Sequence, residues 1–256
     1  MTKARRRDRN QGPGKIRNLR DHYLARFGFR VAVLLLTAVL YFAVPRSFDA
    51  MKGDGFFRHP SWLHLLWFYW IVDMVRQLLP TRRKLALGSL KQFRHFYKPI
   101  RDRLHRKDLL RIIRKGWVDS WKVLGVWTLL MAGLGLLRAK GILLERELLL
   151  VTVTFFVLDL TFVLFWCPFR AWILKNRCCT TCRIFNWGHM MTFSPLLFVP
   201  GFFSASLFGM SIVVFLVWEI RFLLYPERFF EETNEALRCV NCSDPLCGIP
   251  ARKIVT

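Results

Sequence analysis

Acidic residues are scarce in this 256-residue chain: 17 Asp and Glu stand against 40 Lys and Arg, which leaves a formal net charge of +23. Such an excess of positive charge is typical of proteins that contact nucleic acid or an anionic membrane surface. Hydrophobic residues nevertheless make up 54% of the chain, in blocks near the roughly 20 residues that a helix needs to cross a bilayer. A soluble nucleic-acid-binding protein would not carry such blocks. We therefore expect a membrane protein with anionic lipid beside its basic loops, and no nucleic-acid partner.

Familiar catalytic motifs are also missing. The chain has no catalytic serine motif, Walker loop, dinucleotide-binding glycine motif or H-E-x-x-H sequence, which removes the enzyme classes that those motifs define. No small-residue cleavage site of the secretory kind follows the first apolar block, so we expect that block to persist as a helix. The sequence leaves open whether the protein is an enzyme, and on which substrate it would act.

The apolar blocks predict an all-α polytopic integral membrane protein. Four blocks predict one membrane helix each, at residues 27–44, 61–79, 117–137 and 148–166. The next apolar stretch, residues 192–225, would be about 51 Å long as one straight helix, well over the roughly 30 Å hydrocarbon core. Pro200-Gly201 offers a place to turn. This stretch therefore predicts a short hairpin, or a re-entrant leg plus one span, which brings the total to about six membrane segments.

Positive charge sets the expected orientation and the division of the chain. Because Lys and Arg concentrate on the cytoplasmic side of membrane proteins, we expect both termini in the cytoplasm, in a plasma or inner membrane. Within the basic region, apolar residues near one helical face predict an amphipathic helix lying on the anionic leaflet. The expected sections are a disordered basic tail (1–26), two membrane helices (27–79), the basic amphipathic region (80–116), two further membrane helices (117–166), a cytoplasmic cysteine loop (167–191), the membrane hairpin (192–225) and a cytoplasmic cysteine-containing tail (226–256).

Six of the seven cysteines gather in two patches on either side of the expected hairpin. Each patch holds a C-x-x-C pair and one extra cysteine. If the hairpin returns the chain to the same side of the membrane, the two pairs supply four thiolates, the usual ligand set for zinc or an iron–sulfur cluster. The expected ligands are Cys179, Cys182, Cys239 and Cys242, with Cys178 and Cys247 as alternates.

The cysteine pattern leads the functional interpretation. Four thiolates leave a zinc ion no open position, so zinc there would be structural or sensing. An iron–sulfur cluster or redox-active dithiols would instead make the protein an electron carrier. Palmitoylation of the juxtamembrane pair Cys178 and Cys179 is a further alternative.

One acidic residue, Asp159, falls near the middle of the fourth apolar block. A carboxylate there costs about 2.5–3.5 kcal/mol on insertion scales, so it should face protein or water rather than lipid. It is a candidate proton or ion relay in a transporter or membrane enzyme, with Asp73 and Glu219 as helpers. The alternatives are a hydrogen bond to Ser or Thr of a neighbouring helix, a protonated acid and, for Glu219, a simple pair with a nearby basic group.

Overall fold

The computed structural model describes residues 13–51, 55–58, 60–79, 92–94, 96–100, 106–175 and 182–238, with side chains from residue 21 onward except that of Arg106. Every regular element within these ranges is helical. The long helices are α1 (Pro13–Ala43), α3 (Trp62–Leu78), α5 (Arg106–Ala139), α6 (Glu145–Leu164) and α8 (Phe202–Leu224). The shorter elements are α2 (Gly55–Arg58), α7 (Gly188–Phe193), a π turn (Phe169–Leu174) and 3-10 turns at Pro45–Met51, Phe185–Trp187, Ser194–Phe198, Pro226–Arg228 and Glu235–Leu237.

Four helices in the described part of the chain are long and apolar enough to cross a membrane, and they indicate an integral membrane protein. They are Asp21–Ala43, Lys107–Ala139, Glu145–Leu164 and Phe202–Leu224. The expected second span is present as α3, but its 17 residues extend only about 26 Å. The all-helical class is confirmed. The count of about six membrane segments stays a prediction.

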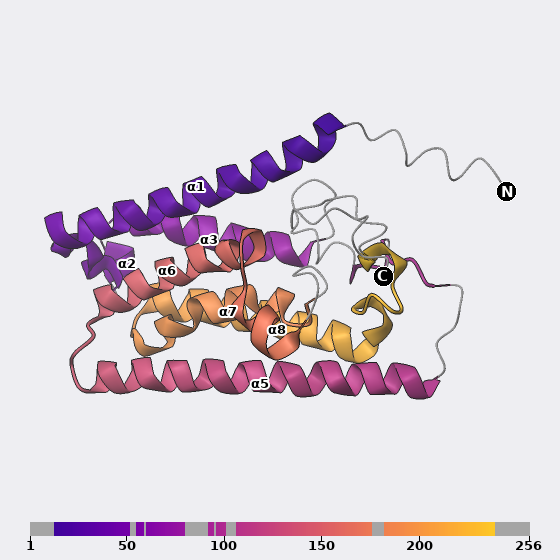
Figure 1. Cartoon of the computed structure of the whole chain (residues 1–256). Helices are drawn as coiled ribbons and strands as arrows, with labels where there is room; N and C mark the ends of the chain where they lie inside the picture. Colours follow the sequence, from indigo (N-terminus) through magenta and orange to yellow (C-terminus); the bar gives the residue numbers. More distant parts are fainter. Residues whose placement is uncertain are drawn as a thin grey trace.

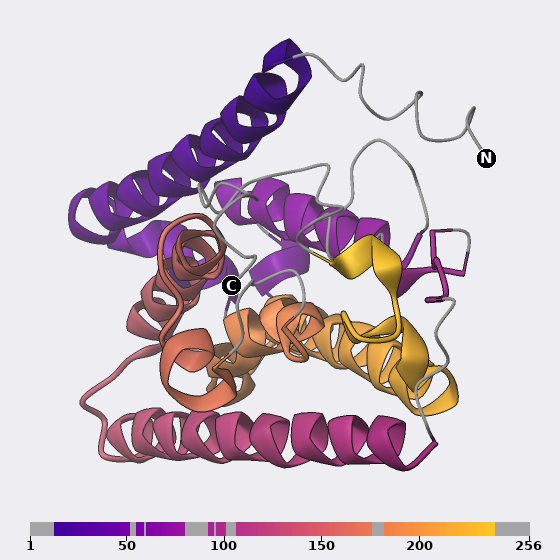
Figure 2. The ribbon, with the colours of Figure 1, turned by 45° about the vertical axis from the view of Figure 1, so that its right-hand side comes forward.

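The long helices lie roughly side by side. Figure 1 shows α1 along the top, α5 along the bottom, and α3, α6, α7 and α8 between them. The most extensive packing is of α1 against α6 and of α3 against α8. Figure 2, turned by 45°, shows that α5 and α1 lie on opposite sides of the inner helices. The arrangement leaves α6 and α8 in the interior, where they contact helices from both halves of the chain.

The helix α5 differs from the sequence prediction. Residues 80–116 were expected to hold a separate amphipathic helix, whereas α5 runs without a break from Arg106 to Ala139. No proline lies in this stretch, and glycine costs only about 1 kcal/mol inside a helix. At 34 residues α5 is about 51 Å long. Its basic first turns therefore continue the axis of the membrane helix, and in the described residues they do not form a helix of their own.

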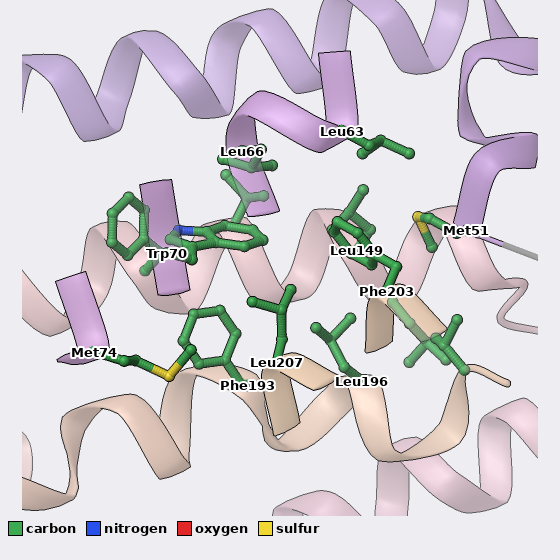
Figure 3. Packing of buried hydrophobic residues seen from close by; sticks show 14 of the residues in the cluster. Met51, Leu63, Leu66, Trp70, Met74, Leu149, Phe193, Leu196, Phe203 and Leu207 are labelled. Atoms are coloured by element: carbon green, nitrogen blue, oxygen red, sulfur yellow. The ribbon is translucent and has the colours of Figure 1, made fainter. Parts of the chain in front are cut away.

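Aromatic and aliphatic side chains from α3, α6, α7 and α8 form the core (Figure 3). Trp70 lies at its centre, with its ring edge-on to Phe156 at 5.7 Å and to Phe193 at 5.1 Å between centroids. Both Trp70 and Phe193 are almost fully buried. The packing ties the short α7 to the long helices, so α7 is held by tertiary contacts rather than by its own six residues.

The chain reverses direction between α7 and α8. Before the turn, Trp187 Nε1 donates a hydrogen bond to Glu219 near the end of α8. Phe198 lies against Gly135 near the end of α5: a β-carbon added at Gly135 would come within 2.8 Å of the Phe198 ring. The backbone turns at Gly201, whose φ of +137° disfavours residues with a side chain. The two legs are unequal: the first is a short broken helix, and the second is α8, with 23 residues.

Candidate functional site

The carboxylate of Asp159 faces protein and is paired with Arg30 of α1. The Arg30 Nη1 donates to Asp159 Oδ2 at 2.8 Å and to the Phe156 carbonyl at 2.7 Å. The guanidinium also lies 4.0 Å above the Phe156 ring. The Arg30 side chain is 12% exposed and that of Asp159 is 36% exposed. The pair joins α1 to α6 across 129 residues of sequence.

A second polar pair lies near the first. His189 Nε2 of α7 is 3.9 Å from Asp73 Oδ2 of α3, and the imidazole stacks on Phe193. Burial holds the pKa of His189 below its ordinary value, although Asp73 opposes the shift. Burial therefore favours the neutral imidazole, and at 3.9 Å the contact with Asp73 is a long one.

Two cavities meet at Asp159. The first, of about 100 Å³, is polar and is lined by residues that include Arg26, Arg30, Asp73, Arg76 and His189. The second, of about 260 Å³, is apolar and lies between α5, α6 and the residues around α7. The two cavities share Asp159, Val163, Phe185 and Gly188 in their walls. Asp73 and Asp159 therefore line the same cavity, and the role of Asp73 as a helper residue stays a prediction.

Glu219, the other expected helper, binds a different set of residues. Its carboxylate accepts a bond from Arg183 Nη2 at 2.5 Å and from Trp187 Nε1 at 2.6 Å. The Arg183 side chain is 5% exposed, and its guanidinium lies 3.7 Å above the Phe222 ring. The alternative of a pair with a neighbouring basic group is thus the one observed. The pair fixes the segment that follows Cys182 to the last turns of α8.

The segment that precedes the second cysteine patch packs against the same end of α8. Phe229 lies edge-on to Phe222, with 5.3 Å between ring centroids, and Phe222 is the residue that Arg183 covers. Further on, the Glu235 amide donates to the Lys98 carbonyl at 2.8 Å. Figure 2 shows this C-terminal segment, in yellow, folded back beside α8. Residues flanking both patches therefore meet at one end of one helix.

Only one of the expected metal ligands falls in the described part of the chain. Cys182 is buried there. Cys178, Cys179, Cys239, Cys242 and Cys247 lie outside the described residues. Among the residues that the structure describes, no group of three or more His, Cys, Asp or Glu is placed to hold a metal ion.

Cys167 stands apart from the two patches. It lines the apolar cavity, and burial raises the pKa of its thiol above the ordinary value. Metal ligation and nucleophilic reaction both need the thiolate. Burial of Cys167 therefore disfavours both metal ligation and nucleophilic reaction.

Sequence reasoning gave no role to Arg30. Arg30 could have been noticed because it is the single arginine in the first apolar block. A cation inside the membrane needs an acidic partner or a carbonyl. Sequence alone did not identify Asp159 as that partner, since no local spacing connects two residues on helices so far apart in the chain.

Comparison of the chain with protein-family models, with curated proteins and with solved structures gives no match. The class is indicated by the structure: an integral membrane protein that is all-helical over the described ranges, with four candidate membrane-spanning helices among them. Within that class, the distinguishing features are the Arg30–Asp159 pair between two cavities and the packing of both cysteine-flanking segments on the end of α8.

A substitution at Gly188 tests the packing around Asp159. A β-carbon at this position would lie 2.6 Å from Asp159 Oδ1, so Gly188→Ala must displace the carboxylate from Arg30. We expect a fall in thermal stability of roughly 1–2 kcal/mol. Gly133→Ala in α5 is the matched control, because nothing lies within 4 Å of the added atom. It should be neutral or slightly stabilising. Equal melting temperatures for the two variants would contradict the assigned contact.

Proposed function

We propose that this integral membrane protein holds a metal ion at its cytoplasmic face through two C-x-x-C pairs. The ligands would be Cys179 and Cys182 from one pair, and Cys239 and Cys242 from the other. Cys178 and Cys247 are the alternates. The ion would join the C-terminal tail to the loop before α7, and its role would be structural or sensing.

One observation carries the proposal: the described segment after the first pair and the described segment that leads to the second pair both contact the same end of α8. Arg183 directly follows Cys182 and is bound to Glu219. Arg238 directly precedes Cys239 and ends a segment that packs on Phe222 through Phe229. Two patches on opposite sides of a bilayer would be separated by about 30 Å of hydrocarbon. The contacts at the end of α8 favour placement on the same side.

Zinc fits the donor set best. Four thiolates give a closed tetrahedral site with no position for substrate or water. The free energy of binding would then stabilise the fold of the tail. Arg177, Arg183 and Arg238 lie beside the cysteines in the sequence. Arg183 pairs with Glu219, so Arg177 and Arg238 would offset the charge of the thiolates.

The surrounding charge supports the orientation in this proposal. The basic tail, the region before α5 and the loop after α6 would all lie in the cytoplasm of a plasma or inner membrane, next to anionic lipid. The first turns of α5 carry Lys107, Arg111, Arg114 and Lys115. These side chains would bind anionic headgroups from a helix that projects beyond the hydrocarbon.

Metal content of the detergent-purified protein tests the proposal. We expect one zinc ion per chain by elemental analysis, and close to none when all three cysteines of one patch are replaced by serine, either Cys178, Cys179 and Cys182 or Cys239, Cys242 and Cys247, because three thiolates cannot complete the site. Cys167→Ser is the matched control and should keep the full content. A wild-type protein without stoichiometric metal would contradict the proposal. Brown protein with visible absorption would assign an iron–sulfur cluster instead, and with it electron transfer.

A second candidate function uses Asp159. Its position between a polar and an apolar cavity favours a transporter or membrane enzyme with this carboxylate at the centre. That role is independent of the cysteines, so Asp159→Asn should abolish it while the metal content stays unchanged.

A further inference from the structure

We propose that the two cavities that meet at Asp159 together bind an amphiphile with one hydrocarbon chain and an oxyanion head, either carboxylate or phosphate. The head would occupy the polar cavity and the chain the apolar one. The wall of the apolar cavity includes Cys182, one of the proposed metal ligands. The amphiphile does not require the metal, and metal content and fatty-acid binding are measured separately, so the failure of one proposal can be told from the failure of the other.

The polar cavity favours an anion by its charge. Arg26, Arg30 and Arg76 line it together with Asp73 and Asp159, so three cations face two acids. Guanidinium groups match carboxylate and phosphate oxygens in two-point contacts. The volume of about 100 Å³ suits a small head rather than a sugar or nucleotide.

Arg30 is preorganised for such a contact. Its guanidinium is held by the Phe156 carbonyl at 2.7 Å and by the Phe156 ring beneath it at 4.0 Å. These two contacts do not involve Asp159. A head that shares Arg30 with Asp159 would therefore meet a cation already fixed in place, which lowers the entropic cost of binding.

The apolar cavity suits the chain. Its volume is about 260 Å³, above the roughly 150 Å³ at which apolar cavities in proteins stay dry and take up hydrocarbon ligands. Its walls are mainly aromatic and aliphatic and include Trp127, Leu130, Phe155, Leu158, Phe162 and Met191. A free anion such as inorganic phosphate would leave this volume unfilled.

The two cavities lie beside each other along α6. The apolar cavity extends from Phe155 past the helix end at Leu164 to Phe169, and the polar cavity adjoins it at Asp159 and Val163. A head bound in the polar cavity would therefore have its chain within direct reach of the apolar one.

Tryptophan quenching by brominated chains tests the site. The probe is a fatty acid brominated along its chain, added to the full-length protein in detergent. The signal is the fluorescence difference between wild type and Trp127→Phe, because Trp127 lines the apolar cavity. We expect saturable quenching by the fatty acid and only linear, weak quenching by a brominated alkane of the same length. A phospholipid brominated on one chain, if it saturates the same signal, would identify the bilayer as the source of the ligand.

Two variants with matched controls locate the head and the chain. Arg76→Gln should weaken fatty-acid binding about tenfold, the loss expected for one charge-assisted contact. Arg46→Gln removes an exposed arginine from the 3-10 turn after α1 and should leave fatty-acid binding unchanged. Leu158→Phe should remove saturable quenching by filling the chain cavity. Leu129→Phe, at a position that is 75% exposed, should not.

Several results would overturn the proposal. The brominated alkane could quench as strongly as the fatty acid, which would indicate an ordinary lipid-facing surface. Inorganic phosphate could raise the melting temperature as much as the fatty acid does, which would indicate a site for a free anion. Unchanged affinity in Arg76→Gln would remove the head site, and this exposed position carries the test even if Leu158→Phe fails to fold.

Discussion

Glu219→Ala is expected to destabilise the protein by roughly 3–5 kcal/mol, the cost of leaving a buried charge without its partner. The stranded charge is that of Arg183, whose side chain is 5% exposed. The variant also removes the acceptor for Trp187 Nε1. Because 1 kcal/mol shifts the melting temperature of a chain of this size by about 2–4 °C, a fall on the order of 10 °C or more should appear in thermal unfolding in detergent.

The same variant connects stability with the proposed metal site. With Glu219 gone, the segment after Cys182 loses its attachment to α8, so we also expect zinc to be extracted faster by a chelator. Glu145→Ala is the matched control: Glu145 pairs with Arg138 at 3.0 Å, at the opposite end of the bundle. Removal of that partly exposed pair should lower the free energy of unfolding by less than about 1 kcal/mol and leave the rate of zinc extraction by the chelator unchanged. Similar effects from both variants would contradict a special role for Glu219.

A double-variant cycle on Arg30 and Asp159 is the second prediction with a large effect. Arg30→Gln or Asp159→Asn alone should cost roughly 2 kcal/mol, below the value for a fully buried pair because the Asp159 side chain is 36% exposed. The double variant should cost much less than the sum of the two, since it leaves no charge unpaired. We expect a coupling energy of about 1–2 kcal/mol, measured as changes in the free energy of unfolding.

The pair Asp119 and Lys122 is a suitable comparison, because its atoms are also 2.8 Å apart but the lysine side chain is 59% exposed. A pair of this kind within one helix is worth about 0.3–0.5 kcal/mol. The cycle on Arg30 and Asp159 should give a clearly larger coupling. Equal values for the two cycles would mean that the distance alone, without burial, determines the interaction.

The long helices were predictable because length and hydrophobicity decide them locally. The fourth apolar block, expected at 148–166, corresponds to α6 at Glu145–Leu164, and the last helix, α8, falls inside the expected stretch 192–225. The turn at Gly201 was also readable, since Pro200-Gly201 cannot continue a helix. What failed was the division of α5 into two elements, because a change from basic to apolar composition does not itself break a helix.

The candidate site was predictable only in part. Asp159 stood out because an acid inside an apolar block is costly and must find a partner. Its partner Arg30, and the contact of Glu219 with Arg183, depend on tertiary packing across 129 and 36 residues. The apolar cavity has no sequence signal either, since its lining residues resemble any other membrane-helix face. Such features follow from how helices pack, which hydrophobic periodicity does not encode.

X-ray absorption at the zinc edge tests the shared metal site most directly. Our account predicts a first shell of four sulfur atoms at about 2.3 Å in the purified wild-type protein. It also predicts that this shell is lost when all three cysteines of either patch are replaced by serine. A shell containing nitrogen or oxygen in the wild type, or a four-sulfur shell that survives the loss of a whole patch, would contradict the claim that the two pairs share one ion.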